Sequence, residues 1–485
     1  MVTRTRRVVV VGGGIAGLAA AYRLSRPEGN GVPLEVTLVE AGERLGGKMS
    51  SIRVGGFDLE AGADSFVVRK PQAVDLCREL GLGEDLVVPA SSAAFVRIGD
   101  RLVPFPRRSS FGVPAGPAEL LRWAGLSLRG RLRAVGDLLR PRSPDRGDEP
   151  LAALLERRLG TEAARFLVGP LLAGIHAGDP AQLSVRATFP ELAAWEREHG
   201  SLVRGAGAAR RKADAERAAP LFASVWGGLG RLVDALAHAI GPPRIRVGER
   251  VRGIGRDAAG FTLDVGTSRL GADAVLLATP AFEASRLLRE ANAEASRELG
   301  GIRYASTAVV LLVYPEGTAE RLPPATGYVV PAGSSVTTAC TWVSRKWPRE
   351  EFGDRAVVRC YVGRSGSEES LALPDNEILA RVRAELDRVL SLGPPEDSAV
   401  VRWERSMPQY DVGHLDRVRR MDEALESTPG LFVAGSAYRG VGIADCVRDG
   451  SSAAGRVRRY LLDARPAGAV VPGAGASSEE RERTR

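Results

Sequence analysis

The first forty residues contain two apolar runs with a helical pattern between them. Residues 7–11 predict a short buried strand, residues 18–24 an apolar helix, and residues 34–39 a second buried strand that ends at an acid. Short apolar runs of this kind are typical of strands that are buried on both faces of a parallel sheet. The chain therefore begins with a predicted β–α–β unit.

A long helical section follows. Residues 71–81 have apolar positions at helical spacing, and residues 117–140 predict a longer amphipathic helix. Its apolar side carries Leu121, Gly125, Leu128, Leu132, Val135 and Leu139. Such a helix can pack inside a helical domain with its arginines in solvent, which we favour, or it can lie on a membrane surface. Further helices are predicted over 150–159, 161–175, 189–199 and 205–218.

From residue 221 onwards the pattern is mostly that of strands. Strand segments are predicted over 244–247, 251–254 and 261–265, followed by a buried strand over 274–279. Alternation then predicts an antiparallel sheet, built from residues 307–314, 326–331, 336–343 and 355–363. The pattern ends with a helix over 375–390, a strand over 398–403, a buried strand over 431–435 and a helix over 443–462.

The turn after the first strand has the glycine pattern of dinucleotide-binding proteins, Gly12–Gly17, in its required strand–turn–helix context. Gly12 permits the tight turn, Gly14 allows a pyrophosphate to approach, and Gly17 lets the helix lie close to the strand. The helix N-terminus offers free N–H groups to the phosphates. Glu40, 23 residues after Gly17, can accept hydrogen bonds from ribose hydroxyls and disfavours a 2′-phosphate. FAD or NAD is therefore expected rather than NADP.

Two further features refine this expectation. Residues 43–48 carry a second glycine pair beside Arg44 and Lys48, which suits another close approach of backbone to phosphate. No second strand-bound glycine pattern of this type exists in the chain. Because an enzyme that takes hydride from NAD(P)H usually needs its own nucleotide site, a single site favours a flavoprotein oxidase with a different electron acceptor.

Composition indicates an ordinary soluble protein, with 44% apolar and 26% charged residues. No apolar stretch approaches the roughly 18–20 residues of a membrane span, and the N-terminus lacks a signal-peptide layout. We therefore expect a cytoplasmic protein that could still touch a membrane surface. Its four cysteines and four histidines are scattered, so no metal site is predicted and the cysteines are expected to be reduced thiols.

Positive charge is concentrated in one segment. The net charge is +8, and residues 101–146 contain ten arginines against Glu119, Asp137 and Asp145. A GC-rich coding bias would produce the same use of arginine. The location nevertheless suggests an anionic partner, which could be an acidic ligand, a lipid surface or another protein. Nucleic acid is disfavoured, because no binding motif or aromatic stripe accompanies the arginines.

These patterns predict a mixed α/β fold, α+β overall. A chain of 485 residues needs more than one core, and its nucleotide-binding segments are separated in sequence. We expect a split Rossmann-type FAD-binding domain with two insertions, a mostly helical, arginine-rich domain and an antiparallel-sheet substrate domain. The expected boundaries are 1–75, 220–290 and 425–463 for the FAD-binding domain, 76–219 for the helical domain, 291–424 for the sheet domain and 464–485 for a disordered tail.

Motifs along almost the whole chain resemble the flavin-dependent porphyrinogen oxidases of haem synthesis. They are Gly174–Asp179, Leu183-Ser184, Thr188–Pro190, Glu198–Leu202, Gly227–Leu229 and Gly440–Cys446. Further motifs resemble the Gram-positive-type coproporphyrinogen III oxidases within that family. These are Ala339–Trp342, Lys346–Pro348, Arg402–Glu404, Met407–Tyr410 and Gly413-His414. His176 departs from the family pattern, because relatives commonly carry tyrosine there.

The resemblance implies non-covalently bound FAD and three two-electron oxidations of coproporphyrinogen III by O2, giving coproporphyrin III and hydrogen peroxide. The alternative within the family is protoporphyrinogen IX, which has two propionates instead of four. The arginine surplus and the lack of an obvious membrane anchor favour the tetracarboxylate. Outside the family, an amine oxidase or a carotenoid desaturase could use the same flavin module. A non-enzymatic alternative is a flavoprotein that delivers porphyrin to a partner such as ferrochelatase.

The resemblance also implies a set of flavin contacts. They fall on Gly12, Gly13, Gly14, Ile15, Ala16, Gly17, Glu40, Ala41, Arg44, Gly47, Lys48, Gly62, Ala63, Asp64, Ser65, Val251, Trp403, Val441, Gly442 and Ile443. The helix that begins near Ile443 would direct its positive end at the flavin pyrimidine ring.

The substrate site is predicted more coarsely. Arg69 and Lys70, just after the flavin loop, are candidates for pairing with propionates, although they could equally form a solvated turn. His176 is the third candidate for contact with substrate. No acid–base pair is predicted, because hydride can pass directly from a meso carbon to the flavin and the pyrrole protons can go to solvent. Residues of the site would therefore act mainly by positioning.

Overall fold

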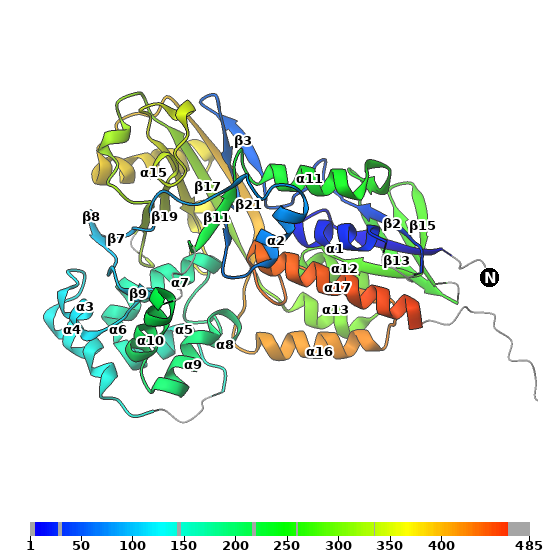
Figure 1. The fold of residues 1–485 in the computed structure, drawn as a ribbon, viewed down its shortest axis with the longest axis horizontal. Helices are drawn as coiled ribbons and strands as arrows, with labels where there is room; N and C mark the ends of the chain where they lie inside the picture. Colours follow the sequence, from blue (N-terminus) through cyan, green and yellow to red (C-terminus); the bar gives the residue numbers. More distant parts are fainter. Residues whose placement is uncertain are drawn as a thin grey trace, which may run out of the picture.

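The computed structural model describes residues 5–27, 32–142, 147–215, 220–258, 260–333 and 335–463. The last part of the arginine-rich segment, 143–146, and the tail predicted over 464–485 lie outside the described residues. Figure 1 shows a region around α1, α11 and α17, a helical region around α3 to α10, and a region of antiparallel strands beside α15.

The first region is built on a parallel sheet of five strands in the order β12–β2–β1–β16–β22. Their bounds are β1 Arg6–Val11, β2 Leu34–Val39, β12 Ile245–Arg246, β16 Ala274–Leu277 and β22 Leu431–Val433. Both faces are covered, because Val8 and Val10 enter one core and Val9 and Val11 the other. This double burial explains why β1 has an uninterrupted apolar sequence.

Helices pack on both faces of the parallel sheet. On one side lie α1 Ile15–Ser25, α2 Gln72–Glu79, α11 Gly230–Ile240 and α17 Ile443–Asp463. On the other side lie α12 Ala281–Leu288, α13 Ala293–Gly300 and α16 His414–Glu426, with the small sheet of β13 Val251–Asp257, β14 Gly260–Val265 and β15 Ser268–Ala272. Two segments far apart in sequence, α1 and α17, therefore lie side by side (Figure 1).

The second sheet has seven strands in the order β21–β17–β20–β19–β18–β7–β8. Their bounds are β7 Phe95–Ile98, β8 Arg101–Pro104, β17 Tyr304–Val313, β18 Gly327–Val329, β19 Thr337–Trp342, β20 Val357–Val362 and β21 Asp397–Pro408. Its neighbours pair antiparallel except β18 and β7, which pair in parallel. One face packs on α15 Asp375–Leu390, and the other on the hairpin of β3 Ser51–Val54 and β4 Phe57–Glu60.

Two strands at one edge of this sheet come from an unexpected place. β7 and β8 lie within residues 76–219, a segment expected to be mostly helical and for which the sequence pattern predicted no strand. Each strand has only four residues, too few for the alternation to stand out from the surrounding turns. The other small strands are β5 Phe66–Val67, β6 Leu86–Val87, β9 Ser109–Ser110, β10 Val113–Pro114 and β11 Phe222–Val225.

The helical region contains eight helices within the described residues. They are α3 Pro117–Arg122, α4 Leu128–Val135, α5 Leu151–Leu159, α6 Thr161–Ala163, α7 Gly169–His176, α8 Val185–Thr188, α9 Pro190–His199 and α10 Leu202–Ala215. The single helix predicted over 117–140 is therefore wrong. Trp123 leaves the helix and donates its indole N–H to the Pro104 carbonyl at 2.7 Å. Ser127 then caps α4 by accepting from the Gly130 N–H at 3.0 Å.

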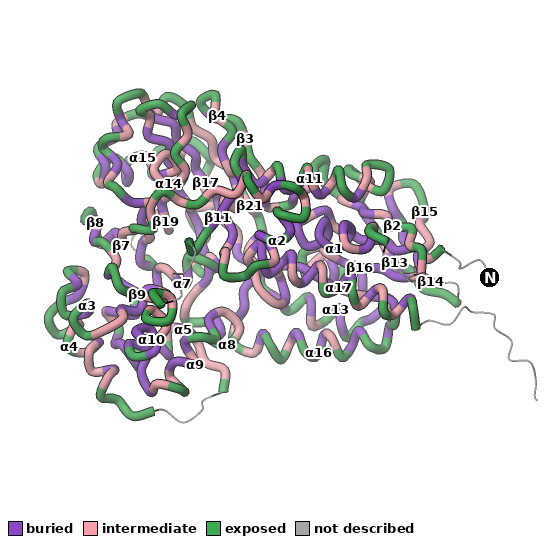
Figure 2. The backbone as a smooth tube through the Cα atoms, viewed as in Figure 1, coloured by how far each residue is buried: buried purple, intermediate pink, exposed green. Residues whose placement is uncertain are grey.

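The break also changes which leucines are buried. Leu120 and Leu126 enter the core of the helical region, whereas Leu128, Leu132 and Leu139 are 70%, 59% and 89% exposed. In Figure 2 much of the backbone tube at α3 and α4 has the colour of exposed residues. Most leucines of the apolar side predicted for one continuous helix thus face solvent, whereas Val135 packs against the core. Within the described residues, none of the helices has the length and apolar character needed to span a membrane.

Part of the arginine surplus is used inside the fold. Arg133 donates to the Glu156, Arg157 and Arg158 carbonyls at the end of α5, each at 3.0 Å. Other arginines of the segment donate to the carbonyls of Leu121, Leu126, Arg157 and Glu198. These side chains satisfy carbonyl groups that helix ends leave without a partner. Much of the positive charge therefore has a structural role.

Candidate flavin and substrate site

The glycine turn between β1 and α1 leaves space at one position only. Gly12 has φ of +110°, and a Cβ there would lie 2.6 Å from the Ala278 carbonyl oxygen. A Cβ on Gly17 would overlap the Gly12 carbonyl. By contrast, a Cβ on Gly14 would meet no heavy atom within 4 Å. Gly12 and Gly17 are thus required by the fold, while Gly14 keeps an open space at the start of α1.

The N-terminus of α1, at Ile15 and Ala16, is suited to an anion. No side chain caps this helix, and its first turn contains no acidic residue. Free N–H groups and the helix dipole favour negative charge at such a position. The local structure is therefore compatible with the phosphate cradle that the glycine pattern predicts.

Glu40 lies directly after β2 and holds the turn in place. Its carboxylate accepts hydrogen bonds from the Gly13 N–H at 2.6 Å and from the Gly42 N–H at 2.7 Å. Ala41 is exposed between them. The Glu249 N–H donates to the Glu40 carbonyl at 2.9 Å, which brings the start of β13, with Val251, to the same edge of the sheet. Two N–H groups thus orient the carboxylate that was predicted to bind ribose.

The second glycine loop packs against the first. The Gly46 N–H donates to the Gly13 carbonyl at 2.9 Å, and a Cβ on Gly47 would lie 3.3 Å from the Gly14 Cα. The Arg44 guanidinium holds this loop by donating to the carbonyls of Leu45, Gly47 and Met49 at 3.1, 2.7 and 3.1 Å. The Arg44 side chain therefore stabilises the conformation of this loop.

Lys48 differs from Arg44 in lacking a partner. It is half-buried, and its ammonium makes no hydrogen bond or ion pair with the residues that the structure describes. Burial lowers the pKa of Lys48, although the nearby Cys446 acts in the opposite direction. A half-buried cation without a counter-charge is costly, and an anionic ligand would remove that cost.

The loop Gly62–Ser65 is fixed from two sides. The Ala63 N–H donates to the Lys48 carbonyl at 3.2 Å, and the Trp403 indole donates to the neighbouring Ala61 carbonyl at 2.8 Å. Ser65 donates its hydroxyl to Asp64 at 2.8 Å. The loop is therefore held between the glycine loops and β21 of the antiparallel sheet.

Asp64 ties this loop to the antiparallel sheet. Its carboxylate pairs with Arg359 at 2.7 Å and Lys346 at 2.9 Å, and accepts from the Trp347 indole at 3.2 Å. Burial by itself would raise the pKa of Asp64, but the two cations outweigh it and hold the pKa well below its usual range. The side chain predicted to contact flavin is thus engaged in a buried ion-pair network.

The start of α17 forms a second helix terminus in this region. It follows Val441 and Gly442, and a side chain on Gly440, where φ is +131°, would overlap the Asp445 carboxylate. Asp445 lies in the first turn and is buried. Sequence reasoning missed this residue as part of the site, although an acid in the first turn of a predicted helix was a usable signal.

Asp445 binds one of the predicted substrate residues. Its carboxylate pairs with the Lys70 ammonium at 2.6 Å and with Arg448 at 3.0 Å. Lys70 is 48% exposed on its side chain and Asp445 only 7%. Arg69 lies over the Phe111 ring at 5.7 Å. The structure thus connects Lys70, but not Arg69, to the helix predicted to face the flavin.

His176 ends α7 close to the same ion pair. Its ring lies 5.6 Å from the Tyr410 ring and 5.8 Å from that of Phe189, and its buried Nδ1 has no hydrogen-bond partner. Burial, with smaller contributions from His414 and Lys70, lowers the pKa of His176 to about 4. The imidazole is therefore neutral at physiological pH, and it can exchange hydrogen bonds with a ligand without carrying charge.

Tyr410 connects His176 to the segment before α17. Its hydroxyl donates to the Ser436 carbonyl at 2.8 Å and accepts from the Gly440 N–H at 2.7 Å, and its ring stacks on His414 at 4.0 Å. Tyr410 belongs to a motif that carried the family resemblance, but nothing in the sequence indicated this bridging position. The site thus joins the helical region to the nucleotide-binding region through one phenol.

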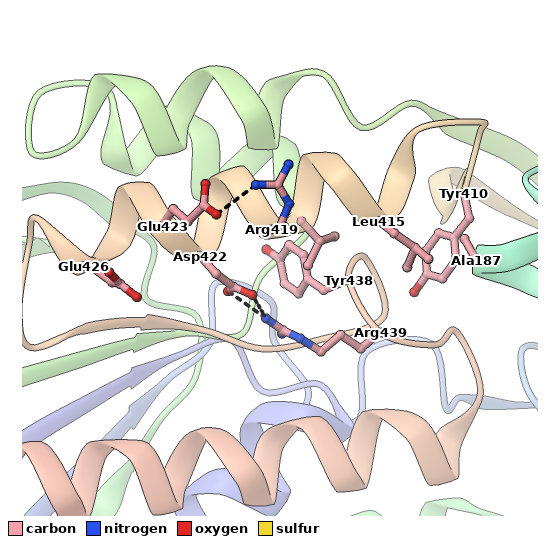
Figure 3. Close-up of a pocket in the computed structure, with 10 residues that line it drawn as sticks. Ala187, Tyr410, Leu415, Arg419, Asp422, Glu423, Glu426, Tyr438 and Arg439 are labelled. Carbon is pink, nitrogen blue, oxygen red and sulfur yellow. Dashed lines mark hydrogen bonds and ion pairs between the residues drawn. The ribbon is translucent and has the colours of Figure 1, made fainter. Parts of the chain in front are cut away.

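A cleft of about 460 Å³ opens on the far side of Tyr410, along α16 (Figure 3). Its two lining arginines are already paired, Arg439 with Asp422 and Arg419 with Glu423. Because both arginines already pair with carboxylates, the described residues of this cleft offer little free positive charge to an acidic ligand. Within the described residues, no group of three or more His, Cys, Asp or Glu side chains is placed to hold a metal ion.

A dinucleotide fits the residues present. Gly14 leaves open space before α1, and Lys48 has an unpaired ammonium beside it in the second loop. At the carboxyl end of β16, the buried Thr279 hydroxyl also has no partner. In parallel sheets, ligands bind outside the carboxyl ends of the strands. These groups lie at that edge and suit a polar, anionic ligand.

Comparison with known proteins shows the family of this chain. Residues 15–458 match the family of flavin-containing amine oxidoreductases, to which the chain therefore belongs. The coproporphyrinogen III oxidase of Bacillus subtilis is 35% identical over 466 residues, covering 94% of this chain and 99% of the relative. The enzyme of that name from Staphylococcus aureus is 32% identical, with 93% and 99% covered. The protoporphyrinogen oxidase of Bos taurus is 33% identical, with 93% and 98% covered.

Solved structures share the architecture. A protein from Exiguobacterium superposes with a TM-score of 0.83 at 33% identity, covering 94% of this chain and 99% of that one. Cyclohexylamine oxidase from Brevibacterium oxydans superposes with a TM-score of 0.67 at 17% identity, covering 94% and 99%, and so shares the fold. The predicted mixed α/β fold and the predicted membership among porphyrinogen oxidases are confirmed, and the protein is a flavin-dependent oxidoreductase.

Proposed function

We propose that the protein oxidises coproporphyrinogen III to coproporphyrin III, using non-covalently bound FAD and O2. Six hydrogens leave the macrocycle in three two-electron steps, and three O2 are reduced to three H2O2. The observation that carries the proposal is the similarity to proteins named coproporphyrinogen III oxidase, which covers 93–94% of this chain and 99% of those relatives. Amine oxidases, by contrast, resemble it at 17% identity.

In this proposal FAD, when bound, accepts hydride from the substrate and passes electrons to O2. The N–H groups at the start of α1 bind the pyrophosphate in the space left by Gly14, and Glu40 binds the ribose. Lys48 supplies a positive charge beside them. Burial raises the pKa of Cys446 to about 12, so its thiol stays protonated, which supports the non-covalent mode of binding. The N-terminus of α17 would direct its positive end toward the flavin ring.

The substrate lies against Lys70 and the end of α7. Lys70 attracts a propionate, and its ion pair with Asp445 holds the ammonium beside the first turn of α17. His176 is neutral and buried, so it offers a flat, uncharged surface to a macrocycle whose carboxylates lie at its rim. Pyrrole protons leave to solvent, and no residue of the chain is needed as a base.

The second candidate substrate is protoporphyrinogen IX, which the 33% identity to the Bos taurus enzyme favours. The decisive experiment starts with the purified full-length protein and its absorbance spectrum. We expect a flavin spectrum, and in air a rise of porphyrin fluorescence from coproporphyrinogen III with about three H2O2 per porphyrin. Comparing kcat/KM on both porphyrinogens decides between them. A protein that neither carries nor rebinds flavin, or that leaves both substrates unoxidised, would refute the proposal.

Other predicted relations remain predictions. They are a cytoplasmic location, contact with a membrane surface and transfer of porphyrin to ferrochelatase. The exposed leucines Leu128, Leu132 and Leu139 within the arginine-rich segment give a surface to examine for the last two. Sedimentation with anionic vesicles, and co-purification with ferrochelatase, are the direct tests.

A further inference from the structure

Arg364 is a buried cation that forms no ion pair with the residues that the structure describes. It follows β20 and is 7% exposed, and its guanidinium makes one long hydrogen bond within the described chain, to the Val330 carbonyl at 3.5 Å. No carboxylate of the described chain forms an ion pair with it. Asp179 acts on it only at longer range, and its carboxylate already accepts from the Ala181 N–H at 2.9 Å and from Gln182 at 3.0 Å.

Arg364 differs from the other buried arginines in lacking an ion-paired carboxylate. Four arginines are buried within the described residues. Three of them pair with a carboxylate: Arg97 with Glu385 at 3.2 Å, Arg158 with Asp137 at 2.5 Å and Arg359 with Asp64 at 2.7 Å. A buried guanidinium that lacks such a partner is strongly disfavoured. Arg364 is therefore kept at a cost to stability, which indicates a partner outside the chain.

Its position is beside the proposed substrate site. The Ser365 N–H donates to the Ala177 carbonyl at 2.8 Å, which brings Arg364 next to the end of α7 and to His176. Gln409 donates to the His176 carbonyl at 3.1 Å. The segments around Arg364, His176 and Gln409 thus meet at one junction of the helical region and the antiparallel sheet.

Two further polar atoms at this junction lack partners. The His176 Nδ1 and the Gln409 Oε1 are both buried without a hydrogen bond. Buried polar groups in folded proteins nearly always have a partner in the protein or in a bound molecule. Two unsatisfied groups beside a buried guanidinium that has no ion-paired carboxylate in the described chain therefore point to a polar ligand, and the guanidinium favours an anionic one.

We propose that Arg364 binds a propionate of the macrocycle, at a position where protoporphyrinogen IX carries no carboxylate. This inference rests on the proposed function and deepens it, because it assigns the preference for the tetracarboxylate to one residue. Arg364 can form a bidentate pair with a carboxylate inside a buried site, where such a pair is strongest. Lys70 is half exposed and shared with Asp445, so it attracts propionates with less discrimination.

The test compares three variants of the flavin-loaded enzyme. Arg364→Gln removes the charge, Arg364→Lys keeps it without the bidentate geometry, and Arg381→Gln is the control. Arg381 is an exposed arginine of the same sheet domain whose ion pair is with Glu377 on α15. For Arg364→Gln we expect KM for coproporphyrinogen III to rise about tenfold or more, with kcat little changed. KM for protoporphyrinogen IX should change less than about twofold, and Arg364→Lys should recover part of the loss.

Two readouts independent of turnover complete the test. Without ligand, Arg364→Gln should keep or raise Tm, because it removes an unpaired buried charge. Coproporphyrin III should raise Tm of the wild type and of Arg381→Gln but not of Arg364→Gln. Equal KM changes on both substrates, or a Tm several degrees lower without ligand, would overturn the inference while the proposed function stands. Failure of the wild type on both porphyrinogens would instead remove the proposed function itself.

Discussion

Arg359 and Arg364 lie five residues apart, the first on β20 and the second in the turn that follows, and they are 2% and 7% exposed. Arg359 pairs with Asp64 and donates to the carbonyls of Glu60 and Gly62 at 3.1 and 3.3 Å. The Arg364 guanidinium has one hydrogen bond, at 3.5 Å, and no ion-paired carboxylate in the described chain. The two arginines are therefore buried to a similar extent, but only Arg359 has a carboxylate partner.

The difference separates a scaffold charge from a ligand charge. The ion pair between Arg359 and Asp64 connects the Asp64 loop to the antiparallel sheet. It therefore stabilises the folded chain itself. The unfavourable free energy of burying the Arg364 guanidinium is offset only when an anion binds to it. A buried ion pair is thus weak evidence for a binding site, whereas an unpaired buried cation beside other unsatisfied groups is stronger evidence.

The largest predicted effect is the loss of stability when Arg359 is replaced. Arg359→Gln leaves the buried Asp64 carboxylate with Lys346 as its remaining cation, so the protein should lose about 3–5 kcal/mol of unfolding free energy. Urea unfolding of the flavin-loaded protein, with Arg364→Gln measured in parallel, checks this. A similar loss in both variants would show that the two arginines are equivalent, and the comparison above would fail.

The next effect concerns pH and His176. Its pKa is about 4 when folded and 6.5 unfolded, so the unfolded state binds more protons between these values. Stability should therefore fall as pH drops from 6.5 to 4, by roughly 3 kcal/mol from this residue. His176→Phe keeps an aromatic ring and removes the titration. Denaturant titrations at several pH values should show a shallower decline in the variant, and an unchanged slope would contradict the assignment.

A third prediction separates cofactor binding from folding. Gly14 has φ of −70° and open space around it, so Gly14→Val should leave the flavin-free fold within about 0.5 kcal/mol. The valine would fill the cradle, and FAD should bind at least about tenfold more weakly. The matched change Gly17→Val should prevent correct folding, because its Cβ overlaps the Gly12 carbonyl. Flavin content per chain and FAD titration measure both, and unchanged affinity in Gly14→Val would refute the proposed cradle.

The smallest effect is expected at Lys70. Lys70→Ala should raise KM for coproporphyrinogen III about threefold, more than for protoporphyrinogen IX. The effect is modest because the ammonium is half exposed and already shared with Asp445. Steady-state kinetics on both substrates provide the measurement. Equal changes on the two substrates would argue against a propionate contact at Lys70.

Much of the nucleotide-binding region was predictable from local sequence. The turn at Gly12–Gly17, the strands around it and Glu40 lie within forty residues, and their conformations follow from nearby side chains. The strands β7 and β8 were not predictable, because four-residue segments carry too little pattern. The break after α3 depends on a hydrogen bond from Trp123 to Pro104, which no helical periodicity could indicate.

The sequence by itself determined that the chain begins with a β–α–β unit of the dinucleotide-binding type, because glycine conformation and apolar periodicity act over a few residues. Its motifs, by resemblance, indicated the porphyrinogen oxidases. Only the tertiary structure decided which charges are paired. Lys70 meets Asp445, and Asp64 meets Arg359, across most of the chain length, while Arg364 meets no carboxylate in the described residues. Whether a buried charge has a partner depends on how distant segments pack, and it is this packing that separates a binding residue from a structural one.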